Sequence, residues 1–172
     1  GTTLVVNNGT AYANLGGGIQ GALQINSGGR FYNNTFHVFD RGAGNAIWIN
    51  GGVLAQGVEY YVPSGSVGTP GVQMTGGAWI GGDCRLDGNG GSKPSAYITI
   101  NATNTTALIT ATIHFWQGGT LNLDVSGGSV TGGLYPGVDL EYTGTLLNNF
   151  GGSANPSHVT KTGAGLLEVA VN

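Results

Sequence analysis

Residues 46–54 read Ala-Ile-Trp-Ile-Asn-Gly-Gly-Val-Leu, which is the pattern of a half-buried strand followed by a corner. The two isoleucines fall on one face of the strand, and Trp48 and Asn50 fall on the other. The Gly51-Gly52 pair then permits a backbone conformation that is closed to residues with a Cβ atom. This stretch therefore predicts one strand and one tight corner.

The same pattern recurs along the whole chain. Close copies begin at Leu23, Val72 and Leu121, a copy without the glycine pair begins at Ile98, and looser copies begin at Leu4, Leu140 and Leu167. The intervals between first apolar positions are 19, 24, 25, 26, 23, 19 and 27 residues. Repeats of this length are typical of solenoids. We therefore expect residues 1–172 to form one all-β domain, a single-stranded parallel β-helix of about 7–8 rungs.

Placing the copies in register predicts two apolar columns inside the solenoid and two polar ladders outside it. The inward columns are Leu23, Ile47, Val72, Ile98, Leu121 and Ile25, Ile49, Met74, Ile100, Leu123. The outward ladders are Gln24, Trp48, Gln73, Thr99, Asn122 and Asn26, Asn50, Thr75, Asn101, Asp124. Amides and hydroxyls in register can hydrogen-bond along such a stack.

Residues 159–169 read Val-Thr-Lys-Thr-Gly-Ala-Gly-Leu-Leu-Glu-Val, and this motif resembles the passenger-associated repeat of autotransporter proteins. Leu166 and Glu168 stand where that repeat usually has threonine, and residues 140–155 resemble the coil that leads into it. The resemblance implies a right-handed parallel β-helix in a large, secreted, surface-exposed bacterial protein. Residues 159–172 would then form a repeat-like final rung.

Composition excludes several classes of partner. Only 13 of the 172 residues are charged, and the net charge is −3. No basic stripe is available to neutralise phosphates, so we expect no nucleic-acid partner, and no apolar run approaches the length of a membrane span.

The lone Cys84 predicts no intramolecular disulfide. The chain starts inside strand-like sequence without an initiator Met, which we interpret as a processed mature form or an excised piece.

Candidate chemistry is sparse. Asp124 and Glu141 are the only acidic residues that the repeat would bring near each other, and we interpret them as surface carboxylates, so no catalytic residue and no cofactor are expected. Asp83, Asp87 and Asn89 form a weak Ca²⁺ candidate, with a plain turn as the alternative. A polysaccharide lyase or hydrolase is the third choice of function.

Aromatic side chains are the candidates for surface recognition. Trp48 is predicted to face outward, and Trp79 and Trp116 have no predicted facing. All three could stack on sugars or on another chain, and packing under a loop is the alternative. Four glycosylation patterns, which chance explains in a chain this rich in Asn and Thr, begin at Asn8, Asn33, Asn101 and Asn104.

Both ends of the expected solenoid carry strand-like sequence without a polar cap. The expected assembly interface consists of Leu4, Val5 and Val6 at one end and Leu167, Val169 and Val171 at the other. Uncovered parallel strands are templates for further strands. We therefore expect a non-enzymatic extracellular or cell-surface structural protein, a homo-oligomer that stacks head to tail into a filament, sheath or matrix fibre.

Two alternatives stay open. The further strands could belong to neighbouring coils of the same longer chain rather than to a second copy. The chain could also be an adhesin or glycan-binding passenger segment of a larger autotransporter-like protein, with an aromatic and Asn/Thr face as its binding surface.

Overall fold

The computed structural model describes ten stretches of the chain, and all regular structure in them is β-strand. The stretches are 2–13, 21–33, 46–57, 60–61, 65–66, 68–86, 95–116, 119–131, 136–150 and 156–170. No helix occurs in these stretches, so none of them offers a helix long and apolar enough to cross a bilayer. The absence of helix agrees with the period-two alternation that the sequence shows.

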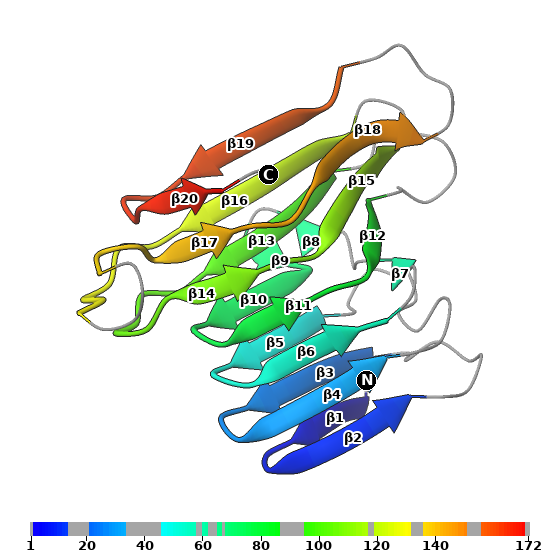
Figure 1. Ribbon diagram of the computed structural model, residues 1–172, viewed down its shortest axis with the longest axis vertical. Coiled ribbons are helices and arrows are strands. Elements are labelled where there is room, and N and C mark those ends of the chain that lie inside the picture. Colours follow the sequence, from blue (N-terminus) through cyan, green and yellow to red (C-terminus); the bar gives the residue numbers. More distant parts are fainter. Residues whose placement is uncertain are drawn as a thin grey trace.

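Three parallel sheets make up the fold (Figure 1). The first sheet consists, in spatial order, of β1 (Thr2–Val6), β3 (Gly21–Asn26), β5 (Ala46–Asn50), β10 (Val72–Thr75), β13 (Ser95–Ile100), β16 (Thr120–Val125) and β19 (His158–Thr162). The second consists of β2 (Gly9–Ala13), β4 (Gly29–Asn33), β6 (Val53–Gln56), β11 (Ala78–Ile80), β14 (Ala107–Ile109), β17 (Leu140–Tyr142) and β20 (Leu167–Val169).

The third sheet consists of β12 (Asp83–Leu86), β15 (Thr112–Trp116) and β18 (Leu146–Phe150), with the two-residue β7 (Tyr60–Tyr61) at its edge. A small antiparallel hairpin pairs β8 (Gly65–Ser66) with β9 (Thr69–Pro70). Successive strands of each parallel sheet come from successive copies of the repeat, and this arrangement is consistent with a β-solenoid.

The inward columns of the first sheet form the centre of the core. They run Leu4, Leu23, Ile47, Val72, Ile98, Leu123, Lys161 and Val6, Ile25, Ile49, Met74, Ile100, Val125. The predicted columns are confirmed from Leu23 to Ile98 and from Ile25 to Ile100, and these side chains are buried. Each fully buried aliphatic side chain contributes about 1.5–3 kcal/mol to folding.

The predicted register of β16 is wrong by two residues. Leu121 pairs with Ala96, and Leu123 takes the position beside Ile98. The same slip places Asp124 beside Thr99. Because side chains alternate with period two, a slip of two residues keeps every side chain on its predicted face and changes only its neighbours.

The copies that begin at Leu140 and Leu167 were expected in the first sheet, and they lie in the second. The next strand after β16 is β17, which pairs with β14 of the second sheet and not with a strand of the first. Along the column from Leu4 to Lys161 the spacings are 19, 24, 25, 26, 25 and 38 residues. The last spacing exceeds the 19–27 residues per coil expected from the sequence.

The glycine pair at the corner after β5 has two separate physical causes. Gly51 has a φ of 73°, in the left-handed region that favours glycine. Gly52 faces the preceding corner so closely that a Cβ atom would lie 2.6 Å from the backbone oxygen of Asn26. The first glycine therefore serves the turn, and the second serves the close stacking of successive corners.

Candidate functional site: the two end rungs

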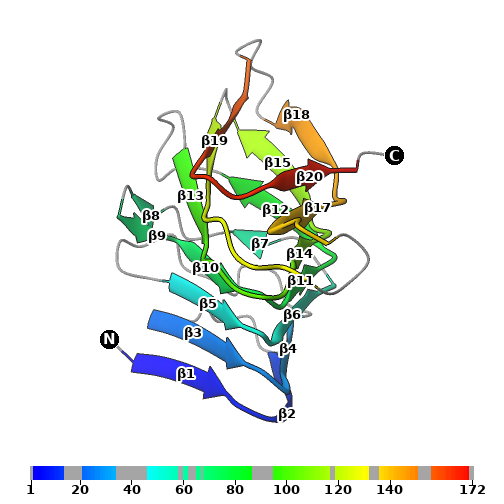
Figure 2. The same ribbon diagram turned by 90° about the vertical axis from the view of Figure 1, so that its left-hand side faces the viewer.

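The outermost described strands are called here the N-terminal end rung, β1 with β2, and the C-terminal end rung, residues 158–169 with β19 and β20. Large hydrophobic side chains that are exposed among the described residues all lie in these two rungs: Leu4, Val5, Tyr12, Val159, Leu166 and Val169. Between the rungs, the aliphatic columns are buried. The exposed large hydrophobic side chains of the described residues therefore lie at the two ends of the stack. Figure 2 shows β1 and β2 at one end and β19 and β20 at the other.

The N-terminal end rung has an open strand edge, because β3 is the only strand that pairs with β1 within the described parts of the chain. Leu4 lies at the end of the first inward column and is 43% exposed, and Val5 points outward. Val6 was expected in the interface, and this prediction is wrong because Val6 is buried in the core beside Ile25. On the second sheet, the ring of Tyr12 stacks on the ring of Tyr32 in the next rung, with centroids 5.6 Å apart.

A directional amide ladder leads to the same end. Asn50 Nδ2 donates to Asn26 Oδ1 at 3.2 Å, and Asn26 Nδ2 donates to Asn7 Oδ1 at 2.6 Å. Farther along, Asn101 Nδ2 donates to Thr75 Oγ1 at 3.0 Å. Strand register confirms the predicted column from Asn26 through Asn50 to Thr75, and these bonds join Asn26 to Asn50 and Thr75 to Asn101. Because each amide donates toward the N-terminal side, a further rung beyond Asn7 with an acceptor would extend the ladder.

The C-terminal end rung is not the bare edge that the sequence led us to expect. Lys161 occupies the inward position beside Leu123, at the end of the apolar column. Its Nζ donates to the carbonyl oxygen of Gly163 at 2.7 Å, so the amine has a partner at the corner that follows β19. A charged residue at an inward position is a known protection of edge strands. Val171 lies outside the described residues.

Alternation along the sequence could have identified this lysine. Val159 and Lys161 share a face, as Leu121 and Leu123 do in the preceding strand. The sequence pattern places the first apolar position of the last copy at Leu167, so residues 158–162 are not aligned with Leu121 and Leu123 in that pattern. Leu167 and Val169 instead form the end of the second sheet, where Leu167 is half-buried against the core and Val169 is 47% exposed.

The tryptophans have different environments. Trp48 is half-buried on the outer face of β5, as predicted. Trp79 is completely buried in the second sheet's inward column between Leu54 and Ile109, so its assignment as a surface contact is wrong. The inward position of Trp79 follows from the pairing of β11. The side chain of Trp116 lies outside the described residues.

The carboxylates that the sequence placed near each other are on different sheets. Asp124 lies on β16 of the first sheet, whereas Glu141 lies on β17 of the second. Glu141 instead lies beside Glu168 on the outer face. The expected neighbourhood of Asp124 and Glu141 is therefore wrong, because the copy at Leu140 belongs to the other sheet.

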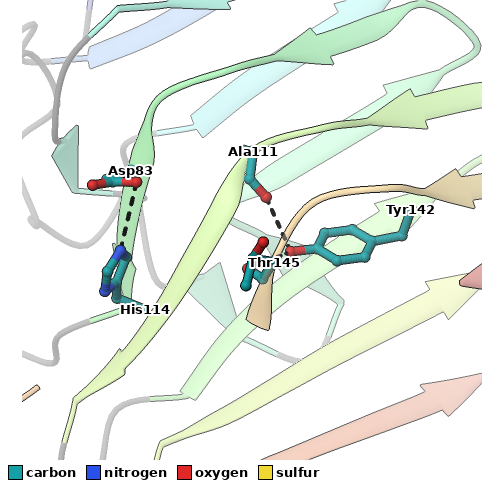
Figure 3. A network of polar contacts seen from close by, with 5 residues as sticks. All are labelled: Asp83, Ala111, His114, Tyr142 and Thr145. Atoms are coloured by element: carbon teal, nitrogen blue, oxygen red, sulfur yellow. Dashed lines mark hydrogen bonds and ion pairs between the residues drawn. The ribbon is translucent and has the colours of Figure 1, made fainter. Parts of the chain in front are cut away.

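The Ca²⁺ candidate is only partly described. The side chain of Asp83 is exposed, and its Oδ1 lies 3.5 Å from Nε2 of His114 (Figure 3). Asp87 and Asn89 lie outside the described residues. Within the stretches that the structure describes, no group of three or more His, Cys, Asp or Glu side chains could hold a metal ion.

Two further polar residues of the sequence are buried. Asn33 Nδ2 donates to Gln56 Oε1 at 2.8 Å inside the second sheet, so the glycosylation pattern at Asn33 is not accessible. Cys84 is also buried and is free of any disulfide. These residues therefore belong to the core and not to a surface site.

Comparison with family models, with curated proteins and with the solved structures finds no match for this chain. The likeness of residues 159–169 to the passenger-associated repeat therefore stays a prediction from the sequence.

Proposed function

We propose that this chain is a non-enzymatic structural segment of an extracellular or cell-surface protein, and that its two end rungs join further rungs of the same kind. The observation that carries the proposal is the confinement of exposed large hydrophobic side chains to the end rungs, among the described residues. The proposed architecture is a right-handed parallel β-helix of seven coils, with the handedness taken from the autotransporter-like motif. The proposed occupant of each end is a second copy, stacked head to tail.

Strand direction supports head-to-tail stacking. All strands of the first sheet are parallel, so a copy displaced along the stack presents its β1 to β19 in the parallel sense. In one such register, Leu4 follows Lys161 in the inward column and Val5 lies beside Thr162. This contact joins two different surfaces and does not close on itself, so it generates filaments.

The second sheet fits the same register. Ala11 would follow Val169 in the inward column, and Thr10 would follow Glu168 on the outer face. Arg30 lies directly beyond Thr10, so a cation would stand two rungs away from Glu168. Because these opposite charges lie in one outer column, they favour head-to-tail stacking over head-to-head or tail-to-tail stacking.

The contact between two copies is expected to be weak, because burial of apolar side chains favours it and desolvation of a charged amine opposes it. Covering a partly exposed aliphatic side chain gains about 1 kcal/mol, which is a fraction of the value for full burial. Desolvation of the Lys161 amine opposes stacking, although the Gly163 carbonyl already accepts its hydrogen bond. We therefore expect assembly that increases with protein concentration.

A charge placed in the inward column of β1 tests the proposal. Leu4→Lys puts an amine into the column that stacking would bury, whereas Gln73→Lys puts the same group on the outer face of β10, away from both end rungs. In negative-stain electron microscopy and light scattering at high concentration, we expect filaments for the wild type and Gln73→Lys, and none for Leu4→Lys. Circular dichroism and thermal melting show whether each variant is folded.

Wild-type protein that stays a monodisperse monomer at high concentration would contradict stacking between copies. Neighbouring coils of the same longer chain are the other source of end-rung partners. In that case, imaging of the longer native chain would show a continuous solenoid, with Leu4 and Val169 covered within one polypeptide.

A further inference from the structure

A pocket of about 210 Å³ lies on the outer face of the first sheet, where β13, β16 and β19 stack. Its lining includes Gly68, Tyr97, Thr99, Asn122, Asp124 and Thr162. The pocket is smaller than the sites of about 300–1,000 Å³ that hold drug-sized ligands. It is therefore suited to a single small ring.

The register of the three strands builds the floor of the pocket. Tyr97 lies beside Asn122, and Thr99, Asp124 and Thr162 form the next row. The register of β16, which differs by two residues from the predicted one, places Asp124 between the two threonines. The floor therefore depends on the pairing of strands and not on one local motif.

The β8–β9 hairpin supplies a wall. Its turn contains Gly68, whose φ of 77° allows the tight reversal between the two short strands. Figure 2 shows the hairpin standing outside the first sheet beside β10 and β13. The concavity therefore lies between this hairpin and the outer face of the first sheet.

Hydrogen bonds within the floor leave acceptors for a ligand. Thr162 Oγ1 donates to Asp124 Oδ1 at 3.2 Å, and Asn122 Nδ2 donates to the carbonyl oxygen of Ala96 at 3.3 Å. These contacts orient both side chains and use only one oxygen of Asp124. Asp124 Oδ2 and Asn122 Oδ1 are then acceptors that a donor-bearing ligand can use.

We propose that this pocket binds one pyranose ring of a neutral carbohydrate. Adjacent hydroxyl groups would donate to the Asp124 carboxylate and the Asn122 amide oxygen, while a C–H face of the ring packs against Tyr97. A phosphorylated or acidic ligand would be repelled by Asp124, and a purely apolar one would desolvate that carboxylate without a hydrogen bond. The proposal rests on the pocket alone and is independent of stacking between copies.

Amide chemical shifts of the ¹⁵N-labelled chain test this site. The probes are the methyl glycosides of glucose, mannose, galactose and N-acetylglucosamine at millimolar concentration, with the acyclic polyol sorbitol as the control ligand. We expect at least one glycoside to shift amides of β13, β16 and β19 around the pocket, and sorbitol to leave them unchanged. Asp124→Asn should weaken that binding by about tenfold or more, because it removes a charged acceptor.

Glu168→Gln is the matched control, since it removes a carboxylate from the outer face of the second sheet, away from the pocket. It should leave glycoside affinity unchanged. If Asp124→Asn disturbs folding, Tyr97→Leu provides a second variant, which keeps apolar volume and loses the aromatic face. The proposal is overturned if no glycoside shifts the pocket amides, if sorbitol binds equally well, if Glu168→Gln weakens binding as much as Asp124→Asn, or if the shifts gather around Trp48 instead.

Discussion

Tyr142 shows how one buried polar group couples the second sheet to the third. Its ring lies in the inward column beside Ile109, and its hydroxyl lies 3.0 Å from the carbonyl oxygens of both Ala111 and Thr145 (Figure 3). Burial, followed by the neighbouring Cys84, raises the pKa of Tyr142 well above its ordinary value. The hydroxyl therefore stays protonated and keeps its donor while the protein is folded.

This raised pKa makes alkaline stability depend on Tyr142. In the unfolded chain the phenol ionises near its ordinary pKa of about 10, whereas the folded protein holds the proton. The contribution is therefore complete below that pH and is lost as pH rises toward the folded pKa. We expect the free energy of unfolding, measured by urea titration, to fall above about pH 10, and Tyr142→Phe to reduce that slope.

The same substitution has a separate effect at neutral pH. Tyr142→Phe removes the hydroxyl that bonds the Ala111 and Thr145 carbonyls, which should lower stability by about 1 kcal/mol. An unchanged alkaline slope in Tyr142→Phe would show that other groups control unfolding at high pH.

Glycine positions provide a second test at the scale of single residues. A Cβ at Gly52 would lie 2.6 Å from the backbone oxygen of Asn26, whereas a Cβ at Gly127 would meet its nearest atoms at an ordinary 3.7 Å. We expect Gly52→Ala to destabilise the protein by about 1–3 kcal/mol, because backbone on the preceding corner must move. Gly127→Ala should be neutral or slightly stabilising in the same urea titration. Equal effects would contradict the close stacking of corners.

At the scale of elements, the final strand of the first sheet carries its own protection. Lys161 in β19 ends a column that is otherwise aliphatic. Lys161→Leu should therefore increase self-association by exposing an apolar end, with more light scattering at a given concentration. Thr160→Leu adds the same side chain to the outer face of the same strand and should have a smaller effect. The reverse order would show that the inward position of Lys161 does not control this edge.

The sequence predicts which face of each strand is buried, but it does not predict which residues pair between strands. The alternation of Ile47 and Ile49 fixed which face was buried, and β5 has the predicted residues. The register of β16 could not be predicted, because Leu121 and Leu123 are both aliphatic and a slip of two residues leaves every face unchanged. The connection 126–139 carries no strand pattern, so the sheet to which Leu140 belongs could not be read from spacing.

At the scale of the whole molecule, the proposed sites depend on relations between distant rungs. Leu4, Val5 and Val169 were predicted as end-rung residues from their positions, and they are exposed. Lys161 and the pocket beside Asp124 were not predicted, because both follow from which residues pair across strands. Local patterns therefore identified the repeated unit, while contacts that need a register between units required the structure.

Successive coils lie in register, with Asp124 directly beside Thr99. Disulfide trapping tests that relation most directly. Neighbouring parallel strands lie about 4.8 Å apart, within the Cα separations that a disulfide spans, whereas a displacement of two residues exceeds them. Peptide mass spectrometry after oxidation should find an intramolecular disulfide in Thr99→Cys/Asp124→Cys and none in Thr99→Cys/Asn122→Cys. Efficient cross-linking of only the second pair would contradict this register of β13 and β16.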